Sequence, residues 1–578
     1  MQRASRTPYF AFLREFVTRW DALALVVVLG LVAFLAEASH GLLAPLSQLD
    51  ATPMSLAPAH LPEYAARTTL RMFVAMGLSL FFTLSYATWA AKSTRAGRIL
   101  IPLLDILQSV PILGFVSITV VFFMSLVPGR VLGAEFAAIF AIFTSQAWNM
   151  AFSFYQSLRT VPTELAEAAE SFHLTAWMRF WRLEVPFGLP ALIWNMMMSM
   201  SGSWFFVVAS ESFSVGHTAV TLPGIGSYIA LAIERRNLHA VGWAIGTMAV
   251  VILIYDQLLF RPLIAWVDRF RVEQEPGAEP PTSWALTRMR RSRLVSGLTL
   301  AFYAVVRLTR WALPSRTAPL RTLSVTIPRD SRIRAALWLA LLVLVAGLAL
   351  RKLGQTLVAQ THWNELREVS WLALLTMTRV VVLIALASLL WVPIGIWVGL
   401  RPRAAQIVQP VAQFLAAFPT NLIFPLVVYG IVTWRLNPDI WLSPLMILGT
   451  QWYILFNVIA GAAAMPAELR RAAENFHVKG WLWWRKVALP SVMPFFVTGA
   501  ITASGGSWNA AIVAELASWG TTQVRAHGLG AYIAEASTAG DFHRIVLGIA
   551  TMCVFVVTIN RFLWRPLYYF AERRYRLT

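Results

Sequence analysis

Long apolar runs separated by short polar stretches recur along the whole chain. In the first half they cover residues 22–36, 68–91, 100–126, 134–158, 191–212 and 238–260, and in the second half 335–352, 370–400, 405–434, 440–464, 492–515 and 543–564. An apolar run of about 18 residues can cross the ~30 Å hydrocarbon layer of a membrane as a helix. The pattern therefore predicts an all-α polytopic membrane protein with about 12 transmembrane helices, six in each half.

Residue patterns of the first half return 304 residues later, in the same orientation. The register holds without a gap over the pairs Glu164 and Glu468, 168–170 and 472–474, His173 and His477, Pro186 and Pro490, 202–204 and 506–508, Glu211 and Glu515, and 261–262 and 565–566. A repeat of this length indicates two copies of one structural unit. We therefore expect two six-helix repeats, 1–268 and 335–578, joined by a linker, 269–334.

The linker begins with a Pro/Gly/Glu tract, 273–281, that cannot continue a helix. Residues 294–313 are partly apolar but contain Arg307 and Arg310, and each Arg would cost ~2.5 to 3.5 kcal/mol near the bilayer centre. We expect this segment to lie on the cytoplasmic membrane surface rather than to form a thirteenth span.

Composition excludes a water-soluble fold. Hydrophobic residues make up 58% of the chain and charged residues 13%, well below the roughly 25% of charged residues in a soluble domain. The formal net charge of +20 would suit nucleic acid, but the basic residues gather beside the spans, with 13 Arg and 4 acidic residues in the linker. We therefore expect contact with membrane lipid and no nucleic-acid partner.

The basic clusters also predict the topology, because Lys and Arg concentrate in cytoplasmic loops. With six spans per repeat, both termini are cytoplasmic and the repeats are parallel, related by a pseudo-two-fold axis along the membrane normal. Arg235 and Arg236 do not fit this scheme, because they fall on the outer side. The run 22–36 resembles a signal peptide, but its counterpart 335–352 lies in mid-chain, so an uncleaved span is favoured.

A polar segment repeated between two spans is the main functional candidate. It runs from Val161 to Pro186 in the first copy and from Met465 to Pro490 in the second. Proline at a helix start, followed by Glu, favours a short helix, and the second proline is expected to end the segment before the next span. Pairs of small Ala residues would let another surface approach one side of this helix closely.

These segments resemble the EAA loops of the membrane permeases of type I ABC importers, through Glu167-Ala168-Ala169 with Val185-Pro186 and Ala472-Ala473 with Leu489-Pro490. In that family the loop forms a coupling helix that docks in a cleft of an ATPase subunit. The resemblance implies this role for Glu164, Glu167, Ala168, Ala169, Glu170, His173, Glu468, Arg471, Ala472, Ala473, Glu474 and His477. The chain departs from the motif where His173 and His477 replace Gly, and where Arg471 replaces Glu.

The energy source is expected to lie on other chains. A P-loop requires Gly-Lys-Ser/Thr, but none of the four lysines follows a glycine. We predict no enzyme activity, no cofactor and no metal site here, with ATP and Mg²⁺ on two partner ATP-binding cassette ATPase subunits. The lone Cys553 excludes an internal disulfide. Since the longest external loop is about 37–66, the resemblance also implies a separate periplasmic or lipid-anchored binding protein at a bacterial inner membrane.

The span after each polar segment is the expected lining of the translocation pathway. Its polar candidates are Asn195, Ser203, Trp204 and Glu211 in the first copy, and Ser507, Trp508, Asn509 and Glu515 in the second. A carboxylate at membrane depth is costly and is therefore a functional candidate. Packing between helices would equally explain the small polar residues, and an interfacial location would explain the carboxylates.

A glycine motif follows each of these glutamates, at 223–229 and 528–533. It resembles the nitrate, sulfonate, taurine and bicarbonate branch of the importers, which implies a small oxyanion as the solute. Arg525, His527 and His217 near the outer mouth would attract an anion. Arg71 and Arg379, at matching places in two spans, are further candidates, although snorkelling to the interface is the favoured interpretation of both.

Two other classes remain open. A secondary transporter with two parallel halves fits the span count, but it needs no repeated coupling loop. A membrane signalling scaffold fits too, and would show no substrate-stimulated ATP hydrolysis. A membrane enzyme is disfavoured, because Asp105, Asp256 and Glu135 have no neighbours spaced for metal or nucleophilic chemistry.

Overall fold

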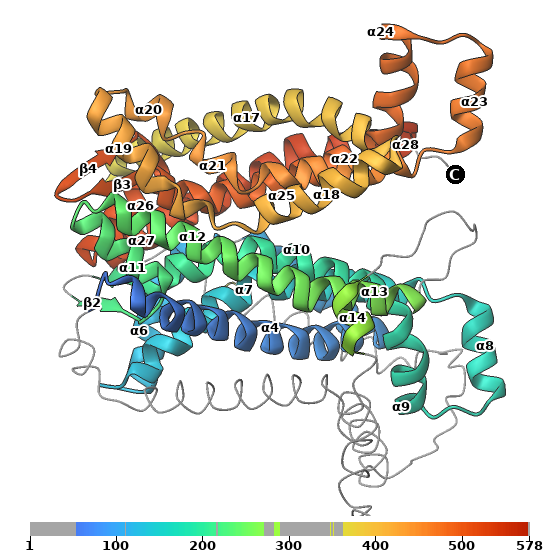
Figure 1. Ribbon diagram of the computed structural model, residues 1–578, viewed down its shortest axis with the longest axis horizontal. Helices are drawn as coiled ribbons and strands as arrows, with labels where there is room; N and C mark the ends of the chain where they lie inside the picture. The colour runs from blue at the N-terminus through green and yellow to red at the C-terminus, as the bar shows by residue number, and fades with distance from the viewer. Residues whose placement is uncertain are drawn as a thin grey trace, which may run out of the picture. The chain divides into compact units, whose positions relative to one another are not determined.

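The computed structural model describes residues 54–109, 111–215, 218–270, 283–289, 347, 351 and 362–575 (Figure 1). The predicted span 22–36 and the surface segment 294–313 lie outside these residues, as does the span 335–352 apart from Gly347 and Arg351. Of the linker 269–334, only residues 269–270 and 283–289 are described, so its boundaries stay a prediction.

The first repeat consists of helices and one short hairpin. In chain order they are the 3-10 turn η1 Pro58–His60, α4 Leu61–Lys92, α5 Thr94–Ser109, α6 Ile112–Leu126, α7 Val131–Arg159, α8 Thr163–Ser171, α9 Ala176–Arg179, the π-helical turn η2 Phe180–Glu184, α10 Val185–Glu211, β1 Ser212–Val215, β2 Thr218–Thr221, α11 Ile225–Glu234, α12 Leu238–Tyr255, the π-helical turn η3 Asp256–Phe260, α13 Arg261–Val267 and the 3-10 turn η4 Asp268–Phe270. The short α14 Trp284–Met289 follows in the linker.

The second repeat follows the same order with more breaks. Its elements are α17 Trp363–Gly399, α18 Pro402–Ala417, the 3-10 turn η5 Thr420–Leu422, α19 Phe424–Trp434, α20 Pro438–Trp441, α21 Leu445–Leu448, α22 Gln451–Ala463, α23 Ala467–Asn475, α24 Gly480–Trp483, the π-helical turn η6 Trp484–Ala488, α25 Leu489–Ala514, β3 Leu516–Trp519, β4 Thr522–Arg525, α26 Leu529–Ala539, α27 Phe542–Ile559, the π-helical turn η7 Asn560–Trp564 and α28 Arg565–Tyr575. Each hairpin is antiparallel, pairing Ser212 with Thr221 and Leu516 with Arg525.

Seven described helices are long and apolar enough to cross a membrane, and two bent helix pairs raise the number to nine. The all-α multi-pass class and the two repeats are confirmed. Two predicted spans are not straight, however: 405–434 bends by 67° between α18 and α19, and 440–464 bends by 44° before α22. Pro419 lies at the first bend, where it cannot donate a helical hydrogen bond. Pro111 likewise separates α5 from α6 in the predicted span 100–126.

The expectation that Pro186 and Pro490 end the polar segments is wrong. The helical path runs without interruption over Ala176–Glu211 and Gly480–Ala514. A proline ring clashes with the carbonyl four residues earlier in a regular helix, and here a wider π turn precedes the proline and relieves this. The same arrangement occurs four times, with η2, η3, η6 and η7 each ending two residues before Pro186, Pro262, Pro490 and Pro566.

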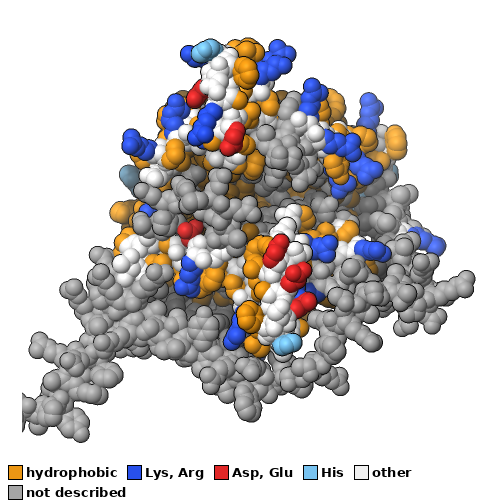
Figure 2. Space-filling model, turned by 90° about the vertical axis from the view of Figure 1, so that its right-hand side faces the viewer, with side chains coloured by type: hydrophobic (Ala, Val, Ile, Leu, Met, Phe, Trp, Pro, Cys, Tyr) orange, Lys and Arg blue, Asp and Glu red, His pale blue; other side chains and the backbone are white. Residues whose placement is uncertain are grey.

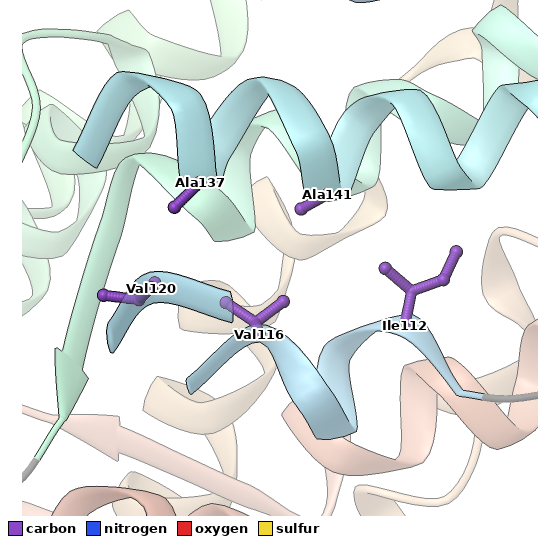
Figure 3. Close-up of a cluster of buried hydrophobic side chains, with 5 residues drawn as sticks. All are labelled: Ile112, Val116, Val120, Ala137 and Ala141. Atoms are coloured by element: carbon purple, nitrogen blue, oxygen red, sulfur yellow. The ribbon is translucent and has the colours of Figure 1, made fainter. Parts of the chain in front are cut away.

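Small residues allow the helices of the first repeat to approach closely. Ile112, Val116 and Val120 lie on one face of α6, directed toward Ala137 and Ala141 of α7 (Figure 3). Each of these five side chains is at least 91% buried, and the spacing of four residues keeps them on one helix face. Small side chains at such contacts suit helix packing in a bilayer, where close van der Waals contact drives association.

The described chain divides into two compact units. Of the described residues, 162–185 belong to one unit together with 287–289, 347, 351 and 362–368, and the other unit comprises 54–109, 111–161, 186–215, 218–270, 283–286 and 369–575. The second unit contains the spans of both repeats, which contact each other directly. Asn421 Nδ2 donates to the Phe205 carbonyl over 3.1 Å, and the Gly520 N–H donates to the Ile233 carbonyl over 2.9 Å. Arg236, which did not fit the topology, donates from Nη2 to Thr521 Oγ1 over 3.0 Å.

Candidate functional site

The two polar segments begin with the same backbone. The residue that precedes α8, Pro162, has φ −56° and ψ 141°, and the residue that precedes α23, Pro466, has φ −55° and ψ 138°. Each helix is nine residues long and carries one Glu in its first turn, Glu164 or Glu468. A carboxylate there interacts favourably with the positive end of the helix dipole, so proline and glutamate together determine where each helix starts.

The two helices also end alike. His173 and His477 adopt left-handed conformations with φ 49° and 51°. The His173 N–H donates to the Glu170 carbonyl over 2.9 Å, and the next N–H donates to the Ala169 carbonyl over 3.1 Å, with equivalent bonds in the second copy. This is the Schellman motif, in which Gly usually occupies the left-handed position. Histidine is among the residues enriched there, so the replacement of Gly preserves the turn.

One Ala of each pair holds the helix in place and the other faces outward. Ala169 and Ala473 are 4% and 7% exposed, and Ala473 packs in a cluster with Met465 and Val487. Ala168 is exposed and Ala472 is partly exposed.

The charged residues of these segments lie on the molecular surface. Glu164, Glu167, Glu170 and His173 are exposed in the first copy, and Glu468, Arg471, Glu474 and His477 are exposed in the second. Figure 2 shows acidic side chains in a row along one exposed helix, and basic side chains spread over other parts of the same face. Every charged residue named from the motif is therefore available to another molecule.

A buried ion network joins three elements of the first repeat. Arg71, in the first third of α4, makes two bonds of 2.6 Å to Glu135 of α7, from Nε and from Nη2. Its Nη1 donates to Glu211 Oε1 at the end of α10 over 2.7 Å, and to the Pro223 carbonyl over 3.0 Å. The side chains of Arg71, Glu135 and Glu211 are 4%, 9% and 0% exposed. Snorkelling, the interpretation favoured for Arg71, is therefore wrong.

The second repeat contains the equivalent network in a more open form. Arg379 of α17 donates from Nη1 to Glu515 Oε1 over 3.0 Å, and from Nη2 to Asp439 Oδ1 over 2.7 Å. Asp439 also accepts the His527 N–H over 2.7 Å, and its Oδ2 lies 3.0 Å from His527 Nδ1. Glu515 is 2% exposed, whereas the side chains of Asp439 and His527 are 35% and 68% exposed.

Each glutamate also holds the start of the short helix that follows the hairpin. Glu211 Oε2 accepts the Gly226 N–H over 2.6 Å, and Glu515 Oε2 accepts the Gly530 N–H over 2.7 Å. Unpaired N–H groups at a helix start need such acceptors, and a carboxylate there is further stabilised by the dipole. Burial raises the pKa of the Tyr228 hydroxyl in the same helix, and this hydroxyl donates to the Leu56 carbonyl over 3.0 Å.

The glycine motif after each glutamate has a steric cause. A Cβ at Gly224 or Gly528 would overlap the carboxylate of Glu211 or Glu515. Threonine completes the arrangement, because Thr68 Oγ1 accepts the Ile225 N–H over 3.0 Å and Thr376 Oγ1 accepts the Leu529 N–H over 2.9 Å. In both repeats this Thr lies three residues before the Arg, on the same helix face. The Thr-x-x-Arg pair was the sequence signal that could have revealed the networks.

The remaining predicted pathway residues make contacts between helices. Ser203 Oγ lies 2.6 Å from Ser145 Oγ, and Ser507 Oγ lies 2.9 Å from Thr450 Oγ1. Asn195 Nδ2 donates to Ser153 Oγ over 2.8 Å.

Asn509 and the two tryptophans lie in the C-terminal part of the same spans. Asn509 Oδ1 accepts the Ile112 N–H of the other repeat over 2.6 Å. Trp204 and Trp508 are fully buried. Interhelix packing accounts for the hydroxyl and amide contacts, and a pathway lined by these residues stays a prediction.

Comparison with known proteins gives the same twofold division. A family model described as binding-protein-dependent transport system inner membrane component matches residues 79–269 and again 391–577.

Within the described residues, no group of three His, Cys, Asp or Glu side chains is placed to hold a metal ion.

Three curated relatives each align with about a third of the chain. One is the bicarbonate transport system permease protein CmpB of Synechococcus elongatus, 27% identical over 194 residues, which are 33% of this chain and 66% of the relative. Another is the glycine betaine/carnitine transport permease protein GbuB of Listeria monocytogenes, 28% identical over 184 residues, 31% of this chain and 59% of the relative. A third is the nitrate import permease protein NrtB of Leptolyngbya laminosa, 25% identical over 179 residues, 31% of this chain and 61% of the relative. The chain thus spans slightly less than two thirds of each relative's length.

Replacing Arg71 with Met should destabilise the protein strongly. Two carboxylates would remain buried without their cation, and breaking such a pair costs about 3 to 5 kcal/mol. The measurement is the melting temperature of the purified protein in detergent. Arg379→Met is the matched control, and its effect should be smaller because Asp439 is partly exposed to solvent. If the two variants lowered the melting temperature equally, the degree of burial of each network would not determine how much its arginine stabilises the protein.

Replacing both His173 and His477 with Gly should leave stability unchanged or slightly improved, because Gly adopts the left-handed conformation without steric cost. Val at the same two positions should lower stability by about 1 to 2 kcal/mol for each residue, because its Cβ is crowded in this conformation. Melting temperatures of the two double variants test this. If Gly destabilised the protein as much as Val, the imidazole side chains would be needed for more than the turn.

Proposed function

Because the chain belongs to the family of binding-protein-dependent transport system inner membrane components, we propose that it is the transmembrane permease of an ATP-binding cassette importer, with both permease units of the importer in one chain. The observation that carries this proposal is the pair of repeated polar segments, 161–186 and 465–490, which we call the coupling segments. Both have the same helix start, the same left-handed end and the same outward-facing Ala, at matching places in two repeats.

The energy for transport would come from two separate ATPase subunits, one docked on α8 and one on α23. ATP and Mg²⁺ would be bound by those subunits, and this chain would carry no cofactor and catalyse no reaction. Its part is to convert the closing and opening of the ATPase pair into alternating access of the membrane pathway. In many proteins that open and close around a substrate, such conformational changes limit the overall turnover rate.

The helix that follows each coupling segment supports this transmission. In the second repeat, α24, η6 and α25 form one helical path from Gly480 to Ala514. Its inner end follows the coupling segment, and its outer end carries Glu515, which binds the start of α26. A displacement of the coupling segment would therefore be passed along a continuous helix to the elements beyond it. The first repeat has the same path over Ala176–Glu211.

The solute we propose is a small oxyanion such as nitrate, a sulfonate such as taurine, or bicarbonate. The support is the glycine motif after each glutamate, together with similarity to a bicarbonate and a nitrate permease protein. Similarity to a glycine betaine/carnitine permease protein favours a zwitterion as a second candidate. Arg525 and His527 give less support than the sequence indicated, because Glu535 and Asp439 respectively pair with them. His217 lies outside the described residues.

A separate binding protein, periplasmic or lipid-anchored, would deliver this solute to the outer side of a bacterial inner membrane. The basic clusters support an orientation with both termini in the cytoplasm. Membrane lipid would contact the outward-facing apolar side chains of the spans.

Glu167→Trp should separate ATP hydrolysis from transport in proteoliposomes that contain this chain, its ATPase and its binding protein. Glu167 is exposed on α8, so a bulky side chain there would obstruct docking without disturbing the fold. We expect solute uptake to fall about tenfold, equivalent to about 1.4 kcal/mol of coupling. Glu167→Gln keeps the size of the side chain and should retain most of the uptake. With the unaltered protein, uptake driven by an ion gradient without ATPase would instead indicate a secondary transporter, and the absence of substrate-stimulated ATP hydrolysis would indicate a signalling scaffold.

The same proteoliposomes test the solute class. Uptake of radiolabelled nitrate or bicarbonate should be stimulated by ATP and should be reduced by excess unlabelled oxyanion. Glycine betaine is the comparison solute, because it carries a quaternary ammonium group as well as a carboxylate. Transport of betaine with no transport of any oxyanion would replace the first candidate with the second.

A further inference from the structure

The two coupling segments share a backbone and a set of exposed aromatic side chains. Phe172 and Phe476, one residue before the left-handed turn, are 78% and 82% exposed. Trp177 and Trp481 are 41% and 74% exposed. Large apolar side chains exposed together mark a surface for interaction with another protein. The two segments therefore present the same apolar contact points to their partners.

Their charges differ at two neighbouring positions of this common helix. Ala166 and Glu167 of α8 correspond to Arg470 and Arg471 of α23 in the register of 304 residues. As a result, α8 carries three Glu and no basic residue, whereas α23 carries two Glu and two Arg. Glu167, Arg470 and Arg471 are all exposed.

The residues after each helix increase this difference. Residues 162–185 contain four Glu and two Arg, whereas residues 466–489 contain two Glu and five Lys or Arg. Lys479 is exposed directly after the turn of the second segment, where the first has Thr175. Arg179 lies 3.5 Å from Glu170 in the first segment, but the Glu170 side chain remains 70% exposed. The first segment thus presents an acidic surface and the second a basic one.

We propose that the two segments dock on two chemically different ATPase surfaces. The surface that receives α8 carries Lys and Arg around an apolar pocket for Phe172, and the surface that receives α23 carries Asp and Glu around an equivalent pocket for Phe476. Complementary charge across an interface selects the right partner and disfavours the wrong one. This inference rests on the proposed function, and it names the kind of partner surface that each coupling segment requires.

Site-specific crosslinking in native membranes tests the proposal. Ser171 and Asn475 occupy equivalent exposed positions on α8 and α23, so each is changed to Cys in a Cys553→Ser background. A benzophenone maleimide on that Cys captures any neighbouring residue, and mass spectrometry identifies the crosslinked ATPase peptide. We expect the Ser171→Cys probe to reach a surface rich in Lys and Arg, and the Asn475→Cys probe to reach one rich in Asp and Glu.

Variants that exchange the charges of α8 and α23 test the proposal quantitatively, through the crosslink yield. Ala166→Arg with Glu167→Arg gives α8 the charges of α23, and should reduce the crosslink yield from Ser171→Cys about fivefold while leaving the yield from Asn475→Cys unchanged. Arg470→Ala with Arg471→Glu should do the reverse. Charges at the edge of an interface chiefly change the rate of association and its dependence on salt. The crosslink yields are therefore compared at low ionic strength, where salt screens these charges least. The amount and melting temperature of each variant show that it folds.

The possible outcomes separate the two proposals. Crosslinks from both positions to the same ATPase residue in the same surroundings would overturn the inference and leave the proposed function standing. Unchanged yields in both exchange variants would overturn it too. Absence of any ATPase crosslink at either position, with both probes shown to be labelled, would overturn the proposed function itself.

Discussion

The position of the hairpin and of the short helix after it depends, in each repeat, on one arginine between two carboxylates, which is buried in the first repeat and partly exposed in the second. In a bilayer no water is available to solvate a charge, so each ionised group must find its partner inside the protein. Arg71 meets this requirement by joining α4, α7 and the end of α10 through Glu135 and Glu211. Because Glu211 also accepts the Gly226 N–H at the start of α11, the same interaction determines where the chain re-enters the helical bundle after the hairpin.

Duplication preserved this constraint while the surrounding helices diverged. Glu135 lies near the start of α7, which is one helix of 29 residues. Its counterpart Asp439 lies on α20, a helix of four residues separated from α22 by further breaks. At this position the second repeat has Asp439, with a shorter side chain than Glu135, and Asp439 also contacts His527. The second network is partly open to solvent. Glu211 and Glu515, by contrast, are both buried, so burial of the glutamate that holds the short helix is what the repeats share.

Local pattern and register predicted most of the fold. Apolar runs predicted the spans because a membrane helix must be apolar over its full length. The constant spacing of 304 residues between the repeats predicted that the coupling segment occurs twice. The ion networks could not be read in the same way, since Arg71 meets partners 64 and 140 residues away and only tertiary structure brings them together. Arg71 and Glu211 were singled out separately, whereas their pairing was missed. The effect of Pro186 was misjudged because a π turn accommodates a proline that would interrupt a regular helix.

The π turns and the networks together suggest why force can cross the membrane without a dedicated hinge. A long helix with its ends held moves as one body, whereas a break at Pro490 would absorb the displacement. In the second repeat, the cluster of Met465, Ala473 and Val487 holds the coupling segment against η6 at one end, and Thr376 and Arg379 hold Glu515 at the other. The helix between them is continuous. In the function proposed here, motion applied at α23 would therefore reach α26 through this apolar cluster, the continuous helix and the bond from the Gly530 N–H to Glu515.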